Sequence, residues 1–190
     1  RLLHAYEIEH ILPPESARQV RPVVYNSWYV TEFDVNYENQ SRAAEIAAQL
    51  GVEIFVMDDG WFGQRNNDRA GLGDWYVNQD KFPEGLDPLI QRVKELGMEF
   101  GIWVEPEMVN PDSDLYRAHP DWIYEFPNRP RSLGRNQYVL NVSRPDVQDF
   151  MVEFLDDLLS NNDIKFVKWD MNRHFSEPGW ADAPAGRDRE

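Results

Sequence analysis

The chain has 190 residues, enough for one domain with a sizeable core or for part of a larger one. Its formal net charge of −15, from 34 acidic and 19 basic residues, repels a nucleic-acid backbone and argues against such a partner. No stretch approaches the roughly 20 apolar residues of a membrane span, so a membrane partner is not expected. Cysteine is absent, which excludes a disulfide framework and suits the cytoplasm. The four histidines show no metal-ligand spacing, so no metal site is predicted.

The first 22 residues differ from the rest. The run PPESARQVRP is bounded by prolines and predicts a linker, and the run RLLHAYEIEH before it does not resemble a signal peptide. We therefore expect residues 1–22 to be the end of a preceding domain with its linker, and residues 23–190 to form a separate unit.

From residue 23 onward, predicted strands alternate with predicted helices. Short apolar runs predict five strands, at 22–28, 52–59, 98–107, 137–142 and 164–169. Helical patterns predict helices at 37–51, 85–97, 111–119 and 144–162. Such alternation predicts an α/β protein with a parallel sheet.

Five βα units fit an open doubly wound sheet as well as part of a (β/α)8 barrel. No Gly-rich phosphate turn follows the first strand, and polar or aromatic residues follow every strand rather than a single switch point. Both observations favour the barrel. Because a complete TIM barrel needs about 250 residues, we predict that residues 23–190 contain about its first five βα units.

The run IKFVKWDMNR at 164–173 carries the strongest single signal. Its apolar residues predict a short strand that is buried on both faces, and Lys168 and Asp170 lie at its carboxyl end. In α/β barrels the chemistry takes place at that end of the strands. A structural Lys–Asp pair that closes the strand is an equally good interpretation of these two residues alone.

Polar and aromatic residues also follow the other strands, and in a barrel they would surround one cavity. Carboxylates, a lysine, an arginine and flat rings suit a ligand with many hydroxyl groups. The residues are Trp28, Asp58, Asp59, Trp103, Glu105, Glu107, Arg135, Lys168, Asp170 and Asn172.

Each of these residues has a simpler interpretation. The run Asp58–Gly60 is by itself a good turn, and Trp28 and Trp103 fit packing in the core. One of the two glutamates beside Pro106 would pair with a basic neighbour, and Arg135 would be solvated or bound to an acid. Taken together, these simpler interpretations become less convincing than a shared binding site, because five successive predicted strands end in such groups.

A carboxylate beside a hydroxyl-rich ligand indicates glycoside chemistry, which normally uses two carboxyl groups. A nucleophilic carboxylate must stay ionised. Lys168 lies two residues before Asp170 on the same strand face, so we expect its charge to lower the pKa of Asp170.

Seven motifs resemble, in order and spacing, the catalytic barrel of glycoside hydrolase family 36, the bacterial and fungal α-galactosidases or melibiases. The resemblance runs from about residue 23 to residue 175, and residues 1–20 resemble the end of the β-sandwich domain that precedes the barrel. The motifs are NSW, MDDGWFG, LGDW, GMEFGIWVEPEMV, HPDW, GRNQYVL and KWDMNR.

The resemblance implies retaining hydrolysis of terminal α-galactosides of the melibiose or raffinose type, without a metal or organic cofactor. Asp170 would be the nucleophile that forms a covalent galactosyl-enzyme. The full-length protein would act on small oligosaccharides and would be a homo-oligomer. The remaining residues would hold the sugar: Asp58 and Asp59 its O4 and O6 hydroxyls, Lys168 and Arg135 other ring hydroxyls, Asn172 the region of O2, and Trp28 and Trp103 the walls.

The chain departs from the family pattern in three respects. The aspartate that serves as general acid/base in the family lies on a later strand, beyond residue 190, and a loop containing Gly and Cys is missing too. Tyr29 also stands where many relatives carry Glu. We therefore expect little or no turnover from residues 1–190 alone.

Three alternatives stay open at this point. Two are enzymes, a galactosyltransferase of the raffinose or stachyose synthase type and an α-N-acetylgalactosaminidase. The third is a non-catalytic galactose-binding module, against which the presence of Asp170 argues, since binding alone needs no nucleophile.

Overall fold

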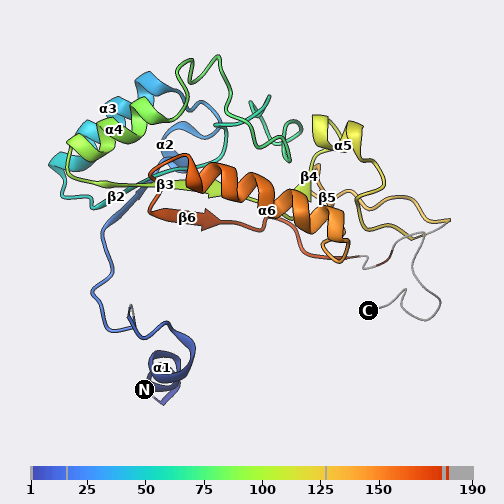
Figure 1. The fold of residues 1–190 in the computed structure, drawn as a ribbon, viewed down its shortest axis with the longest axis horizontal. Helices are drawn as coiled ribbons and strands as arrows, with labels where there is room; N and C mark the ends of the chain where they lie inside the picture. The colour runs from blue at the N-terminus through green and yellow to red at the C-terminus, as the bar shows by residue number, and fades with distance from the viewer. Residues whose placement is uncertain (1, 16, 127, 177–178, 180–190) are drawn as a thin grey trace.

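The computed structural model describes residues 2–15, 17–126, 128–176 and 179, and its centre is a parallel four-stranded sheet (Figure 1). The strand order is β1-β2-β3-β6, and each neighbouring pair is parallel. Parallel strands joined by helices make this an α/β structure. The strands are β1 (Val24–Asn26), β2 (Ile54–Met57), β3 (Glu99–Val104) and β6 (Phe166–Trp169).

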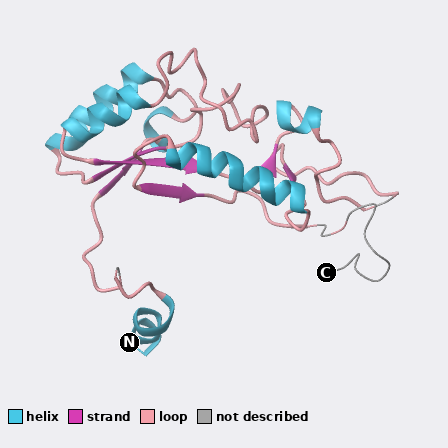
Figure 2. Ribbon diagram, viewed as in Figure 1, coloured by secondary structure: helices cyan, strands magenta, loops and turns pink. Residues whose placement is uncertain are grey.

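Five helices follow the strands, and Figure 2 shows them around the sheet. The side chain of Asn36 accepts a hydrogen bond from the Asn39 backbone N–H, and the side chain of Asn39 accepts one from the Asn36 backbone N–H. These two bonds satisfy N–H groups at the start of α3 that have no partner within the helix. Pro145 occupies the first position of α6, where a missing N–H costs nothing. The helices are α2 (Trp28–Thr31), α3 (Tyr37–Gln49), α4 (Asp87–Glu95), α5 (Asp114–Ala118) and α6 (Pro145–Ser160).

The main core lies between the sheet and helices α3, α4 and α6. All four residues of β2 are buried, and α4 contributes a fully buried stripe of Leu89, Ile90 and Val93. Phe154 and Leu155 of α6 pack against the same core. The predicted helices at 37–51, 85–97, 111–119 and 144–162 are confirmed, as are the predicted strands at 52–59, 98–107 and 164–169, with shorter ends.

The long loop between β2 and α4 is part of the core, although it has little regular structure. Four of its side chains, Trp61, Phe62, Leu72 and Phe82, are fully buried. Gly60 has a φ of 106°, and a Cβ at this position would lie 2.8 Å from the Phe33 carbonyl oxygen. The loop must therefore turn at a glycine, as the DDG run predicts.

The predicted strand at 137–142 is wrong as a strand of the parallel sheet. Within it, β5 (Tyr138–Val139) pairs antiparallel with β4 (Met108–Val109) in a separate two-stranded sheet. The described residues therefore contain four parallel strands instead of five. The alternation of side chains predicts an extended segment, but it does not say which segment pairs with it or in which direction.

Two further expectations about the strands need correction. The first strand ends at Asn26, and Trp28 begins helix α2. Strand β6 is not buried on both faces, since Phe166 is 38% and Trp169 is 49% exposed. The reason is that β6 is an edge strand of the sheet, so one side has no neighbour.

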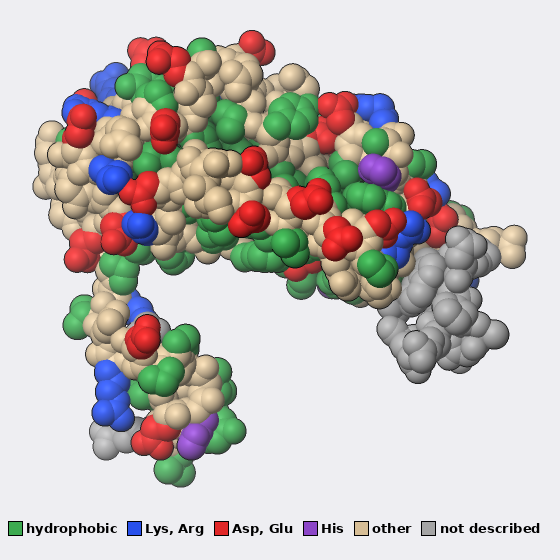
Figure 3. Space-filling model, in the orientation of Figure 1, with side chains coloured by type: hydrophobic (Ala, Val, Ile, Leu, Met, Phe, Trp, Pro, Cys, Tyr) green, Lys and Arg blue, Asp and Glu red, His purple; other side chains and the backbone are tan. Residues whose placement is uncertain are grey.

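The N-terminal segment is helical and stands away from the sheet, as Figures 1 and 3 show. It consists of α1 (Leu2–Tyr6) and a π-helical turn η1 (Glu7–Ile11), and neither contains a buried residue. Its assignment to the end of a preceding domain stays a prediction. In the described part of the chain, no helix is both long and apolar enough to cross a membrane.

Candidate functional site

One pocket lies where β2, β3 and β6 end, and it contains all eight residues to which the family resemblance gave a role, whereas Glu105 and Glu107 do not line it. Because the strands are parallel, their carboxyl ends meet at one edge of the sheet. The structure brings the predicted residues together, while their individual roles stay predictions. The lining consists of Trp28, Asp58, Asp59, Arg65, Trp103, Arg135, Gln137, Lys168, Asp170 and Asn172.

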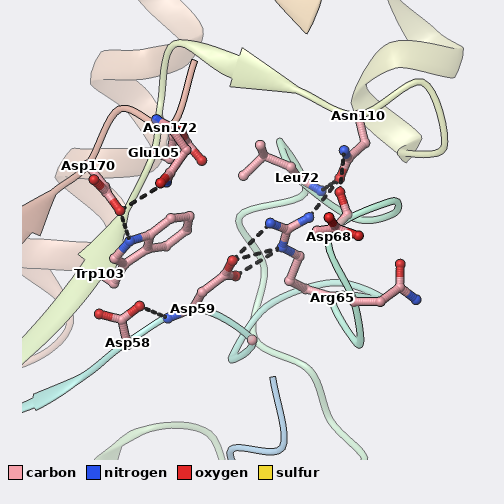
Figure 4. Close-up of polar contacts among 12 residues, drawn as sticks. Asp58, Asp59, Arg65, Asp68, Leu72, Trp103, Glu105, Asn110, Asp170 and Asn172 are labelled. Carbon is pink, nitrogen blue, oxygen red and sulfur yellow. Dashed lines mark hydrogen bonds and ion pairs between the residues drawn. The ribbon is translucent and has the colours of Figure 1, made fainter. Parts of the chain in front are cut away.

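Asp170 follows the last residue of β6 and is half-buried. Its Oδ2 accepts hydrogen bonds from the indole N–H of Trp103 at 3.0 Å and from the side-chain amide of Asn172 at 2.9 Å. Its Oδ1 accepts the backbone N–H of Met171 at 2.9 Å. Figure 4 shows Asp170 between the Trp103 and Asn172 side chains.

These contacts keep Asp170 ionised. Burial raises the pKa of this carboxyl, but the hydrogen bonds from Trp103, Asn172 and the Met171 backbone oppose it. The charge of Lys168 acts in the same direction as these bonds, and the pKa lies below its ordinary value. The expected effect of Lys168 is present, but the hydrogen bonds contribute more.

Lys168 forms its ion pair with Asp58 rather than with Asp170. Its Nζ lies 2.6 Å from Oδ2 of Asp58, which also accepts a hydrogen bond from the Asn26 side chain at 2.6 Å. The backbone N–H of Asp58 donates to the hydroxyl of Ser27, which is fully buried. Residues from the ends of β1, β2 and β6 therefore hold the Asp58 carboxylate in place.

Asp59 pairs with Arg65, a residue that the sequence reasoning missed. The guanidinium binds both carboxylate oxygens, with its Nη2 2.8 Å from Oδ2, and both side chains are almost completely buried. Burial raises the pKa of Asp59, and the hydrogen bonds and charge of Arg65 oppose that rise. The bidentate contact fixes the direction of the Asp59 carboxylate.

A second missed residue connects Arg65 to the opposite side of the pocket. The Arg65 Nη1 donates to Oδ1 of Asn110 at 2.9 Å, and the Asn110 amide donates to the carbonyl of Asn136 at 2.7 Å. Asn136 directly follows Arg135, which lines the pocket. The only sequence signal for Arg65 was a basic residue closely following the DDGWFG motif, and Asn110 had none.

The two tryptophans occupy different environments. Trp28, half-buried, packs edge-to-face against Phe33 with ring centroids 5.1 Å apart. Trp103 is only 1% exposed, so in this structure it contributes mainly its N–H bond to Asp170. Gln137, which also lines the pocket, was not predicted either.

Arg135 and Asn172 form the remaining wall. The Arg135 Nη1 donates to Oδ1 of Asn172 at 3.0 Å. Arg135 has a φ of 52°, in the left-handed region, and so does Asn136 with 59°. This backbone conformation turns the loop toward the end of β6, and it could not be predicted from the sequence because neither residue is a glycine.

Among the described residues, neither of the two glutamates after β3 pairs with a basic residue, contrary to the expectation for one of them. Glu105 accepts the backbone N–H of Asn172 and the side-chain amide of Gln137, the latter at 3.2 Å. Glu107 accepts the indole N–H of Trp169 at 3.0 Å. No group of three or more His, Asp or Glu residues in the described segments is arranged to hold a metal ion.

An ionised carboxylate among hydroxyl-binding groups, at the carboxyl edge of a parallel sheet, is the type of site found in α/β glycoside hydrolases. The sequence model of the melibiase family matches residues 1–190. The chain therefore belongs to the melibiase family, as the resemblance of its motifs implied.

Characterised relatives agree with this assignment. The chain is 55% identical over 170 residues to alpha-galactosidase AgaA of Geobacillus stearothermophilus, covering 90% of this chain and 23% of that protein. It is 52% identical over 162 residues to an Escherichia coli alpha-galactosidase, covering 85% of this chain and 23% of that protein. A solved structure of a GH36 alpha-galactosidase AgaA variant in complex with stachyose superposes with a TM-score of 0.92 at 49% identity, covering 98% of this chain and 26% of that one. The chain thus spans about a quarter of the length of these relatives.

Proposed function

We propose that the full-length protein containing this chain is a retaining α-galactosidase. The observation that carries the proposal is the Asp170 carboxylate, which three hydrogen bonds and a nearby lysine keep ionised within the pocket. The relative named alpha-galactosidase AgaA, of which one variant was solved with stachyose and a second variant with raffinose, supports the substrate class.

In this mechanism a carboxylate oxygen of Asp170 attacks the anomeric carbon of a terminal α-galactoside. A bond forms between that oxygen and the anomeric carbon, and the bond to the leaving-group oxygen breaks. The leaving group takes a proton from a general acid, which the family resemblance places on a later strand, beyond residue 190. Water then hydrolyses the galactosyl-enzyme and releases galactose with its original configuration.

The other pocket residues would hold the sugar ring. Lys168 and Arg65 fix the directions of the Asp58 and Asp59 carboxylates. These carboxylates can therefore accept hydrogen bonds from sugar hydroxyl groups without reorganising. Arg135 and Asn172 offer donors on the facing wall. Such pre-arranged groups contribute to catalysis only if they bind the transition state more tightly than the substrate.

We also propose that the four parallel strands belong to a (β/α)8 barrel. The family membership and the open edge of β6 support this, because an edge strand with large apolar side chains needs a neighbour. The cytoplasmic location and the homo-oligomeric state of the full-length protein stay predictions.

Trapping the covalent intermediate tests the proposed function. The full-length protein is incubated with a 2-deoxy-2-fluoro-α-galactosyl reagent, digested, and mapped by mass spectrometry. We expect the label on Asp170 and its loss in Asp170→Asn, while a control change at the partly buried Asp163, which does not line the pocket, leaves labelling intact. Label on another residue would refute the assignment of Asp170, and no label together with no galactose release would favour a binding module.

A water-only assay separates hydrolysis from transfer. A hydrolase releases galactose from melibiose without an added acceptor sugar, whereas a galactosyltransferase needs the acceptor for efficient turnover. Galactose release that depends on an acceptor would favour the transferase alternative.

A further inference from the structure

Glu105 is a buried carboxylate that the proposed mechanism does not use. It follows the last residue of β3, its side chain is 0% exposed, and it is absent from the residues that line the pocket. Its Oε1 accepts the backbone N–H of Asn172, and its Oε2 accepts the side-chain amide of Gln137. Figure 4 shows Glu105 beside Asn172, close to Trp103 and Asp170.

The two partners of Glu105 belong to two different segments of the chain that line the pocket. Asn172 donates to Asp170 at 2.9 Å and accepts from Arg135 at 3.0 Å. Gln137 lies two residues after Arg135, in the loop with the left-handed backbone. A single carboxylate therefore connects the segment that follows β6 with the loop that carries Arg135.

We propose that Glu105 is a positioning residue for the galactosyl-transfer step. By binding the Asn172 backbone it keeps the Asn172 side-chain amide in hydrogen-bond contact with Asp170, and by binding Gln137 it keeps the Arg135 loop beside the pocket. The inference rests on the proposed function of this site. A displacement of about 1 Å in such an arrangement is enough to cost a hundredfold in rate.

The alternative, a general acid, has to be considered because the pKa of Glu105 is raised. Burial is the main cause, hydrogen bonds from Asn172 oppose it, and the charges of Asp170 and Asp59 add to the rise. A general acid must reach the leaving-group oxygen directly or through one water. Glu105 lies outside the pocket lining and both its oxygens accept bonds from the protein, so its geometry suits positioning.

Three variants of the full-length protein test the proposal. Glu105→Gln keeps an oxygen for the Asn172 N–H, and the Gln137 oxygen, which is buried without a partner, can accept from the new amide after a flip of Gln137. Glu105→Ala removes both acceptors. Glu107→Gln is the matched control, because it changes the same residue type in the same turn, outside the pocket lining.

The kinetic readout uses two substrates, melibiose and α-galactosyl fluoride, whose fluoride leaves without protonation. We expect Glu105→Ala to lower kcat/KM by about a hundredfold on both substrates, and Glu105→Gln to stay within about tenfold of the wild type. Glu107→Gln should equal the wild type. Unchanged kinetics in Glu105→Ala would overturn the proposal, and so would equal losses in the two Glu105 variants or a loss confined to melibiose.

A structural readout covers the case in which Glu105→Ala does not fold. In Glu105→Gln the backbone N–H of Asn172 bonds to a neutral oxygen instead of a carboxylate, so its ¹H and ¹⁵N chemical shifts should move, while Glu107→Gln leaves them in place. Unmoved Asn172 shifts would overturn the inference. If the wild-type protein releases no galactose, the proposed function is refuted. The chemical shifts of Asn172 would still show, independently, whether Glu105 positions Asn172.

Discussion

The ammonium group of Lys168 lies 2.6 Å from the Asp58 carboxylate, which joins the end of β6 to the end of β2 across β3. The Asp58 side chain is 3% exposed and that of Lys168 is 37% exposed. The pair therefore sits at the mouth of the pocket, with its anion inside. It fixes the strand that carries Asp170 relative to the two aspartates that follow β2.

Replacing this lysine should destabilise the protein. We expect Lys168→Met to lower the free energy of unfolding by about 1–3 kcal/mol, since it leaves a buried carboxylate without its counter-charge. The loss of free energy should be smaller than for a fully buried ion pair, because the Lys168 side chain is partly exposed to water. Urea unfolding measures the change.

The control for this variant is Lys165→Met, three residues earlier in the chain. Lys165 pairs with Asp163 at 2.7 Å, but its side chain is 55% exposed. Its loss should lower the free energy of unfolding less than the loss of Lys168 does, because water screens the pair. Equal costs for the two lysines would show that the Lys168–Asp58 pair is no stronger than a surface pair.

The indole N–H of Trp103 should set the acid side of the pH–activity profile. Trp103→Phe removes a hydrogen bond that stabilises the ionised form of Asp170, so the pKa of Asp170 rises. The reaction needs this carboxylate ionised, and activity is lost as pH falls through its pKa. We therefore expect the acid limb of kcat/KM to move to higher pH.

A pH–rate profile of the full-length protein checks this shift. Trp169→Phe is the control, because the Trp169 indole donates to Glu107 instead of Asp170. It should leave the acid limb where it is in the wild type. An unmoved acid limb in Trp103→Phe would mean that this bond does not control ionisation of the nucleophile.

Arg65 should be more important for stability than any exposed arginine of the chain. We expect Arg65→Leu to cost about 3–5 kcal/mol, because the buried Asp59 carboxylate loses a bidentate partner. Arg65→Lys should recover only part of the loss, since an ammonium group cannot reproduce the planar fork. Urea unfolding gives both values.

Arg117→Leu is the comparison for Arg65. Arg117 bonds to Asp112 and Asp114 at the surface, with a side chain 56% exposed, so its loss should lower the free energy of unfolding much less than the loss of Arg65 does. A similar cost at both positions would argue that water enters the Asp59–Arg65 pair.

Glu105 should make stability depend on pH in a defined direction. Burial raises its pKa above the ordinary value of 4.5, so the folded state binds the proton more tightly than the unfolded state. Its contribution to stability is complete below that value and is lost as pH rises through the raised pKa. The wild type should therefore lose stability relative to Glu105→Gln between pH 4.5 and neutral pH.

Urea unfolding of both proteins across this pH range measures the difference. Glu107→Gln, for comparison, should follow the wild type in parallel. A difference that does not change with pH, or one that grows in favour of the wild type toward neutral pH, would contradict the burial effect on Glu105.

Local sequence patterns were sufficient to predict β2, β3, β6 and the helices between them. The runs that became β2, β3 and β6 are short and apolar, and the helices between them carry buried stripes such as Leu89, Ile90 and Val93, so each could be recognised from neighbours in the sequence. The segment 137–142 was misassigned because its partner, β4, lies about 30 residues away and runs antiparallel.

The site was predictable to the same extent. Residues at the carboxyl ends of parallel strands share an edge of the sheet. This rule predicts that Asp58, Trp103 and Asp170 lie close together, and the structure has all three in one pocket. Arg65 and Gln137 lie in loops, where no periodicity predicts which way a side chain points. The contacts of Arg65 depend on how the long loop after β2 packs, and those of Gln137 depend on the loop that leads into β5.

The order of strands and helices, the residue types at the strand ends and the family were thus determined by the amino-acid sequence alone, because they depend on periodicity and motifs within short windows. Tertiary structure decided the partners: Lys168 on Asp58, Arg65 on Asp59, and Glu105 beneath Asn172. Hydrogen bonds and ion pairs depend on separations of a few ångströms between atoms far apart in the chain. Only the packing of loops and strands sets those separations.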